Sequence, residues 1–293
     1  SEKIQEGRAL KTTELRYIPG IQGLRAIAVL LVLAAHAGAP HLHGGLVGVD
    51  MFFVISGYLI TGLLVTELES QGKLGLAQFY ARRLKRLLPA LLFMLGVTSL
   101  AIAAFAPLHE HPAQASSAAS AALWVSNIYF ILTEQSYFES TSLANAFLHT
   151  WSLGVEEQFY LLWPLLILLI YKTTASLRLA VLLFIASASF ILCIWLAQKS
   201  PTLAFYLMPS RIWQFSAGAI VWLLASRPTV RAQLPTNALL LPGLLAIFGA
   251  AFWIDETTRY PDWISLLPTL GTAACLMVLG RQPESKAANT LLG

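Results

Sequence analysis

The sequence predicts an all-α polytopic membrane protein, a transmembrane helical bundle of about nine hydrophobic segments. Only 12% of its 293 residues are charged and 57% are hydrophobic, with a mean hydropathy of +0.67. A soluble domain carries about 25% charged residues, so half of that fraction indicates a chain that lies in a bilayer. Long runs without Asp, Glu, Lys or Arg support this, because roughly 17–25 apolar residues span a membrane as a helix.

The hydrophobic segments follow one another along most of the chain. Five contain no charged residue, at 87–108, 112–133, 179–198, 232–254 and 263–280. Four more contain a few polar residues, at 20–37, 47–66, 154–171 and 204–225. We therefore expect a basic tail at 1–16, a transmembrane domain at 17–280 and a second tail at 281–293.

The basic loops predict the orientation, because Lys and Arg accumulate on the cytoplasmic side. The N-terminal tail and the loop at 67–86 are basic, whereas the loops at 38–47 and 107–114 contain neither residue. This predicts a cytoplasmic N-terminus without a cleaved signal peptide. The later basic loops keep this orientation only if 112–171 crosses once. We therefore expect 116–132 to be a re-entrant or half-buried helix; the alternative is that the charge rule fails there.

The composition also excludes several kinds of site. Cys193 and Cys275 lie in apolar segments, which excludes a disulfide framework. The His-x-His pairs at 41–43 and 109–111 lack a third ligand, so no metal site is predicted. The net charge of +4 lies in loops and indicates topology, not nucleic-acid binding.

The first segment, GLRAIAVLLVLAAHAG at 23–38, holds one arginine and one histidine. Arg25 and His36 are 11 residues apart, so they project from one stripe of a helix. They lie roughly 16 Å apart along it. Polar groups at membrane depth usually face the protein interior, so the pair suggests a polar groove. By itself it also fits an arginine that reaches the headgroups and a histidine that ends the helix.

Asp50 opens the second predicted helix, where a carboxylate caps free N–H groups. It also lies on the outer side, one short loop from His36. A carboxylate that fixes the tautomer of an imidazole supports a general base. Asp50 is therefore a candidate to orient His36.

The stretch FYARRLKRLLP at 79–89 carries a dense cationic cluster. Anchoring at the cytoplasmic face explains a few of these charges. Three arginines within five residues exceed that need, and arginine suits bidentate phosphate binding. Arg83 and Arg86 share a helix face and are candidates to bind a phosphate-bearing donor.

Two further stretches place polar side chains in apolar surroundings. Ser152, Glu156 and Tyr160 are spaced by four residues and share a helix face. Arg211 lies in an apolar segment and needs an acidic partner such as Glu156. An interfacial amphipathic turn and a structural ion pair are the alternatives. We expect the polar side chains to line the path or position the acceptor: His149, Trp151, Ser152, Glu156, Tyr160 and Arg211.

These residues together suggest a group carried through the membrane from an anionic donor to an acceptor hydroxyl. Arginines at the inner end would hold phosphates, and an outer imidazole would take a proton from the hydroxyl. Acyl-CoA fits as the donor, because its pantetheine arm suits a narrow groove. A transporter or lipid flippase that uses the same charges without acyl chemistry is the alternative.

The chain resembles the bacterial membrane acyltransferases of family 3. The motifs that carry this resemblance follow the family's order over 17–280: RAIAVLLVLAAH, GVDMFFVISGYLI, RRLKRLLPA, HTWSLGVEEQFYLLWP and SRIWQFSAGA. The resemblance implies an inner-membrane enzyme of about ten helices that O-acylates, most often O-acetylates, cell-envelope glycans or glycolipids such as lipopolysaccharide O-antigen. It implies cytoplasmic acetyl-CoA or another acyl-CoA as donor, contact with membrane lipid, and no permanently bound cofactor.

The resemblance also assigns roles to residues. Arg25 and His36 correspond to the essential pair, Arg83 and Arg86 to the donor-associated Arg-x-x-Arg motif, and 151–156 to the WSL-x-x-E block. We expect His36 to act as general base or transient acyl carrier, with Arg25 holding the donor in the groove.

Two departures from the family stand out. Gln214 replaces the glutamate of an Arg-x-x-Glu pattern, which puts an acidic role there in doubt. A late tryptophan- and histidine-containing segment is not found after residue 280. We therefore expect the acyltransferase domain to be truncated. Some members of the family also carry an extracytoplasmic SGNH-type domain, which would follow residue 293.

Overall fold

The computed structural model describes residues 18–134, 137, 145–227, 236–255 and 258–280, and this part of the chain contains helices and no strand. The tails assigned to 1–16 and 281–293 lie outside the described residues. Five described helices are long and apolar enough to cross a membrane: α2 (Pro19–His36), α3 (Val47–Gln71), α4 (Leu76–Phe105), α7 (Trp151–Tyr171) and α8 (Ala175–Lys199). The predicted all-α membrane bundle is confirmed.

Shorter helices complete the described part of the bundle. Three are apolar: α10 (Ile212–Ala225), α12 (Thr236–Trp253) and α13 (Leu266–Leu279). The others are α5 (His111–Ala122), α6 (Ser126–Leu132) and α9 (Pro201–Tyr206), with single 3₁₀ turns at Leu108–Glu110, Leu148–Thr150, Met208–Ser210 and Trp263–Ser265.

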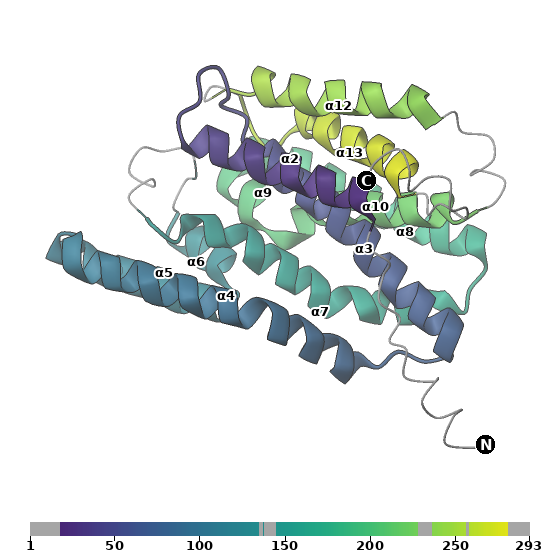
Figure 1. Cartoon of the computed structure of the whole chain (residues 1–293), viewed down its shortest axis with the longest axis horizontal. Helices are drawn as coiled ribbons and strands as arrows, with labels where there is room; N and C mark the ends of the chain where they lie inside the picture. Colours follow the sequence, from purple (N-terminus) through teal and green to yellow (C-terminus); the bar gives the residue numbers. More distant parts are fainter. Residues whose placement is uncertain (1–17, 135–136, 138–144, 228–235, 256–257, 281–293) are drawn as a thin grey trace.

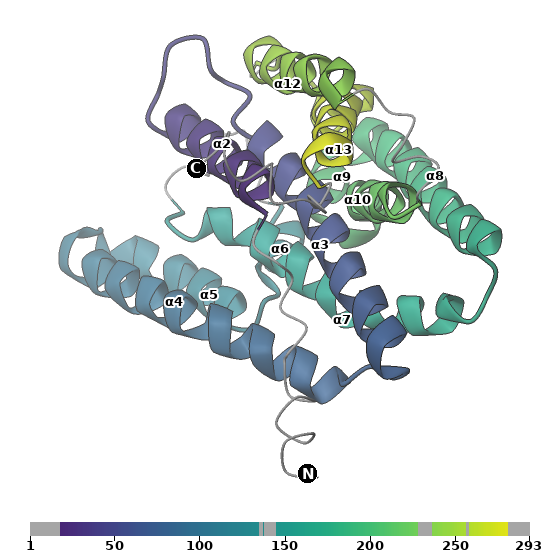
Figure 2. The same ribbon diagram turned by 45° about the vertical axis from the view of Figure 1, so that its right-hand side comes forward.

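Helix α3 is the central element of the bundle (Figure 1). It packs on α2, α7, α10 and α13. In its most apolar stretch of 18 residues, 72% of the residues are buried, compared with 11% in the corresponding stretch of α4. Helix α4 packs mainly on α5, and the two form a flank that stands apart from α3 (Figure 2). The groove described below lies between this flank and the central helices.

Small residues bring α3 and α10 into backbone contact. A Cβ atom at Gly57 would overlap the carbonyl oxygen of Phe215, and one at Gly218 would overlap that of Val54. Such contacts are typical of membrane helices, which associate by close packing because lipid is as apolar as their side chains. They place the start of α10 directly beside α3.

The cationic cluster lies on a helix and not in the predicted loop at 67–86. Helix α3 ends at Gln71, where Gly72 adopts the left-handed conformation with φ of 70°, as glycine commonly does after a helix. Helix α4 already begins at Leu76. Since Arg and Lys are good helix formers, the basic stretch continues α4 into its apolar part.

The segment at 112–133 is not one continuous helix. The chain turns at Trp124, with φ of 57°, between the 12 residues of α5 and the 7 residues of α6. Neither helix has the roughly 20 residues needed to cross the hydrocarbon core, which agrees with the expectation for 116–132. Asn127 of α6 and Gln158 of α7 exchange side-chain hydrogen bonds of 3.3 and 2.9 Å, so α6 is fixed against α7.

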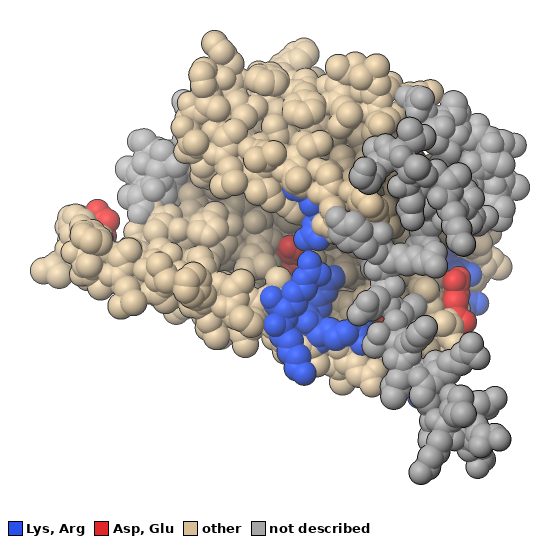
Figure 3. All heavy atoms as spheres, in the orientation of Figure 1, with Lys and Arg blue, Asp and Glu red and all other residues tan. Residues whose placement is uncertain are grey.

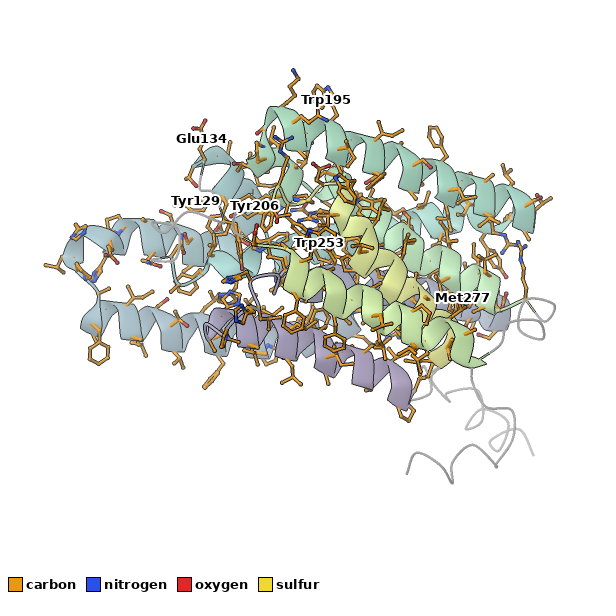
Figure 4. All side chains as sticks on the ribbon, turned by 90° about the horizontal axis from the view of Figure 1, so that it is seen from above. Tyr129, Glu134, Trp195, Tyr206, Trp253 and Met277 are labelled. Carbon is orange, nitrogen blue, oxygen red and sulfur yellow. The ribbon has the colours of Figure 1, made fainter. Side chains whose placement is uncertain are left out.

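Aromatic residues differ sharply in exposure along the bundle; Trp195, Tyr206 and Trp253 are labelled in Figure 4. Tyr206 of α9 is completely buried, whereas Trp195 near the end of α8 and Trp253 at the end of α12 are 56% and 68% exposed. Exposed tryptophans near helix ends are typical of the membrane–water interface.

Candidate active site

A cavity of about 280 Å³ lies between α2, α3, α4 and α7. Figure 3 shows positive side chains beside a hollow that contains an acidic side chain. The structure brings six of the predicted site residues to this cavity: Arg25, Arg83, Arg86, Ser152, Glu156 and Tyr160. Ser56 of α3 lines it as well.

One arginine of the cluster has a structural contact. Arg82 forms an ion pair with Glu67 of α3 at 3.5 Å. The second oxygen of this buried carboxylate accepts a hydrogen bond from the backbone N–H of Gly75 at 2.9 Å. Arg82 therefore joins the end of α3 to the start of α4.

The remaining arginines of the cavity face a different environment. The guanidinium carbon of Arg83 lies 4.1 Å from the centroid of the Tyr160 ring, a cation–π distance. Within the described part of the chain, no carboxylate forms an ion pair with Arg25, Arg83 or Arg86. Their N–H groups are thus available to an anionic ligand.

Glu156 has hydroxyl partners, and no arginine of the described residues forms an ion pair with it. The hydroxyls of Ser56 and Tyr160 both donate to its Oε1, and the Tyr160 hydroxyl also lies 3.1 Å from Ser56 Oγ. The predicted ion pair between Glu156 and Arg211 is therefore wrong. Tyr160 is one helical turn from Glu156, and Ser56 reaches it from α3, which packs on α7.

Arg211 pairs with Asp50 instead. Their side chains are 3.4 Å apart, and each is 1% exposed. The hydroxyl of Tyr260 donates to the other oxygen of Asp50, and Arg211 Nε donates to the carbonyl of Phe205 at 3.1 Å. A buried charge is stable only when it is paired and hydrogen-bonded. The prediction that Asp50 orients His36 is therefore wrong, because both of its oxygens are engaged in the interior.

Arg211 and Trp151 lie in an aromatic cluster behind the cavity. The Arg211 guanidinium carbon is 5.7, 5.2 and 5.8 Å from the ring centroids of Trp151, Phe205 and Tyr260. Trp151 is buried and packs on Phe205 with centroids 4.4 Å apart. Neither residue lines the cavity, so their predicted role in lining the path or positioning the acceptor stays a prediction. Both are large side chains that fill the junction of α3, α7, α9 and α10.

His36 is the exposed last residue of α2. Its Nδ1 lies 2.8 Å from the carbonyl oxygen of Val32. Because a carbonyl only accepts, Nδ1 carries the proton and Nε2 is the acceptor. The hydroxyl of Tyr137 donates to Nε2 at 3.2 Å. Burial raises the pKa of Tyr137 to about 12, so the phenol keeps its proton over the usual range of pH.

A second imidazole lies near His36. His149 is close enough to His36 for their charges to interact, and its carbonyl accepts a hydrogen bond from Ser152 Oγ at 3.3 Å. Ser152 also lines the cavity. The start of α7, with His149 in the turn before it, therefore connects the cavity to His36 at the end of α2.

Sequence reasoning did not identify Tyr137 and Tyr260 as site residues. Their partners His36 and Asp50 are 101 and 210 residues away. Each is a single aromatic residue in a connecting segment, where no helical spacing relates it to its partner. The sequence did offer one signal. Asp50 lies in an apolar segment without a nearby hydrogen-bond donor, which indicates that a residue distant in the sequence donates to its carboxylate.

The chain is similar to several known proteins. A family profile described as an acyltransferase domain matches residues 18–292. The chain is 37% identical over 214 residues to peptidoglycan O-acetyltransferase OatA of Listeria monocytogenes, across 71% of the chain and 34% of that protein. It is 36% identical over 292 residues to putative peptidoglycan O-acetyltransferase YrhL of Bacillus subtilis, across 96% of the chain and 46% of that protein.

A third relative is more similar over a shorter stretch. O-acetyltransferase OatA of Staphylococcus aureus is 47% identical over 153 residues, across 52% of the chain and 25% of that protein. The chain thus spans less than half of the length of each of these relatives. No solved structure matches the chain.

Proposed function

Because the chain belongs to the acyltransferase domain family, we propose that it transfers an acetyl group from acetyl-CoA to a hydroxyl of a cell-envelope glycan. The observation that carries this proposal is the cavity with three unpaired arginines, joined along α2 to His36. Relatives named as peptidoglycan O-acetyltransferases favour peptidoglycan as the acceptor over the O-antigen expected from the sequence.

The donor site is the arginine side of the cavity. Arg25, Arg83 and Arg86 approach it from two helices, and guanidinium groups bind phosphate oxygens with charge-assisted hydrogen bonds. The roughly 16 Å along α2 between Arg25 and His36 suits an extended pantetheine arm. The thioester would then lie close to the imidazole.

The chemistry occurs at His36. The Tyr137 hydroxyl donates its proton to Nε2 and takes up the proton of the acceptor hydroxyl, while the acceptor oxygen attacks the thioester carbonyl. The carbon–sulfur bond breaks, and the CoA thiolate leaves and takes up the proton from the imidazolium. The Nδ1 bond to Val32 keeps Nε2 as the basic atom. A positioned base of this kind accelerates a reaction about 10²–10⁴-fold.

The proposal includes an orientation. Because acetyl-CoA is cytoplasmic, the arginine side of the cavity would open inward and His36 would lie toward the outer face. The basic N-terminal tail supports this orientation. We therefore propose that the chain spans the bacterial cytoplasmic membrane with its N-terminus inside.

Transfer of radiolabelled acetyl groups to glycan oligomers in proteoliposomes tests the proposal. His36→Ala should lower kcat at least 10²-fold, whereas His109→Ala, which changes an exposed histidine of another loop, should leave it unchanged. Equal activity of His36→Ala and wild type would refute the role of His36. Radiolabel retained on the protein at His36 after denaturation would show a transient acyl-histidine instead of direct transfer.

A transporter or flippase predicts a different result. Such a protein would move its substrate without acetyl-CoA and would release no CoA thiol. Measuring CoA release and glycan acetylation in the same vesicles separates the two functions. Substrate movement without CoA release would overturn the proposal.

A further inference from the structure

A continuous series of contacts joins the buried Asp50–Arg211 pair to the outer histidine. Arg211 donates to the carbonyl of Phe205 at 3.1 Å and lies over the same ring, 5.2 Å from its centroid. The Phe205 ring stacks on Tyr137, with centroids 4.9 Å apart and planes inclined by 29°. Tyr137 donates its hydroxyl to His36 Nε2 at 3.2 Å.

We propose that Phe205 and Arg211 are positioning residues for His36, which act by holding the phenol of Tyr137 against the imidazole. The inference rests on the proposed function, in which His36 is the base. It adds two buried residues, neither of which lines the donor cavity, to those that determine the rate of transfer.

Two buried rings hold the ring of Tyr137. Phe205 stacks on it, and Trp151 meets it edge to face at 6.4 Å and 71°. Tyr137 itself lies in a turn outside the described helices. Loss of the Phe205 face therefore removes the closer of these two ring contacts.

The imidazole also needs a second contact. The bond from Nδ1 to Val32 fixes one atom of the ring, and His36 is otherwise exposed at the end of its helix. A hydrogen bond at the other nitrogen fixes the plane of the ring and the direction of its lone pair. Orientation of this kind matters for a base, which must meet its proton within hydrogen-bond distance.

Arg211 supports Phe205 from behind through both its backbone and its ring. Arg211 is neutralised by Asp50, so the cation can remain buried against aromatic faces. The guanidinium fork is rigid and planar, which lets one residue hold the carboxylate and the Phe205 carbonyl at once. Lysine at this position would provide only one point of attachment.

A double-mutant cycle separates positioning from mere stability. Phe205→Leu should lower kcat of acetyl transfer about two- to tenfold, the value of one aromatic contact, with the KM for acetyl-CoA unchanged. In a Tyr137→Phe background, Phe205→Leu should lower kcat no further, because the hydroxyl bond to His36 is already absent. Phe205→Tyr, which keeps the stacking face, should restore wild-type kcat.

Phe215→Leu is the matched control. Phe215 is a buried ring of the same size that stacks on Phe53 and Phe159, with centroids 4.6 and 4.1 Å apart. Among the described residues, its ring contacts do not include Tyr137. Its replacement should lower the thermal unfolding midpoint and leave kcat unchanged. If Phe205→Leu fails to fold, Phe205→Met, which conserves more of the volume, takes its place.

Three results would overturn the inference. The first is a kcat of the Tyr137→Phe/Phe205→Leu variant that is lower than that of Tyr137→Phe by the full factor seen for Phe205→Leu alone. The second is a kcat loss in Phe215→Leu equal to that in Phe205→Leu. The third is a Phe205→Leu variant that raises the KM for acetyl-CoA and leaves kcat unchanged. The His36→Ala variant distinguishes this failure from that of the proposed function. If His36→Ala is inactive while Phe205→Leu keeps wild-type kcat, only the positioning role is wrong; if His36→Ala is active, the proposed function is wrong too.

Discussion

Replacing Arg211 by leucine should destabilise the bundle by about 3–5 kcal/mol, because it leaves Asp50 as an unpaired carboxylate in the interior. Both side chains of the pair are 1% exposed, so water cannot take the place of the guanidinium. The carboxylate would keep one partner, the hydroxyl of Tyr260. The expected loss is therefore that of a half-satisfied charge.

The magnitude follows from the geometry of the pair. At the 3.4 Å between Arg211 Nη1 and Asp50 Oδ1, the Coulomb attraction is about 5 kcal/mol for an effective dielectric constant of about 20. The remaining hydrogen bond from Tyr260 to a charged group contributes about 1.5–3 kcal/mol. This bond places the expected loss toward the lower end of the range, at about 3 kcal/mol.

Thermal unfolding in detergent, followed by tryptophan fluorescence, measures this loss as a shift of the midpoint. Arg82→Leu is the matched control, because Arg82 forms the other arginine–carboxylate ion pair of the described residues, with Glu67, but is 52% exposed. A partly exposed pair contributes about 1 kcal/mol or less. The double variant Asp50→Leu/Arg211→Leu, which removes both charges, should recover most of the stability lost by Arg211→Leu.

Two outcomes would refute this reasoning. One is a midpoint of Arg211→Leu equal to that of Arg82→Leu. The other is a double variant less stable than Arg211→Leu. The single change Asp50→Asn adds a mechanistic distinction: a carboxylate that oriented His36 would lose kcat at an unchanged midpoint, whereas the buried pair predicts a lower midpoint.

Three further changes have expected outcomes. Gly218→Ala should cost about 1–3 kcal/mol, because its Cβ would overlap the carbonyl of Val54; a wild-type thermal midpoint would contradict the close packing of α3 and α10. Arg83→Ala should raise the KM for acetyl-CoA about tenfold or more through lost charge-assisted hydrogen bonds, whereas Arg82→Ala should not, and equal KM values would remove the donor role. Burial raises the pKa of Tyr137 to about 12 from about 10 in the unfolded chain. The protonated phenol therefore contributes its full stabilisation of the fold below pH 10, and this contribution is lost as the pH rises toward 12. Tyr137→Phe should reduce the fall of the thermal midpoint at alkaline pH; an unchanged fall would show that other groups cause it.

Short-range rules were sufficient to assemble the cavity from the sequence. The spacing of Ser152, Glu156 and Tyr160 places them on one face of α7, and the spacing of Arg83 and Arg86 does the same on α4. The structure brings both faces to one cavity. Hydropathy predicted the helical bundle for the same reason, since each span is a property of a local stretch.

Long-range pairing was not accessible in this way. The sequence indicates that Arg211 needs an acid, but Asp50 and Glu156 are both buried-segment carboxylates on other helices. The choice depends on how α10 sits on α3, which is set by the close contact at Gly218 and Gly57. A glycine pair 161 residues apart has no spacing rule that reveals its contact, so the wrong acid was predicted.

The charges of this bundle divide according to whether a partner is built into the fold. Arg211 and Arg82 each have an acidic partner within 4 Å, and their contacts join α3 to α10 and α3 to α4. In the described helices Arg83 faces the cavity beside an aromatic ring, and no acid forms an ion pair with it. An arginine placed in a membrane span without a counter-charge is costly, and that cost is offset when an anionic ligand binds. The unpaired arginines therefore mark the ligand site, and the paired ones mark the frame that holds it.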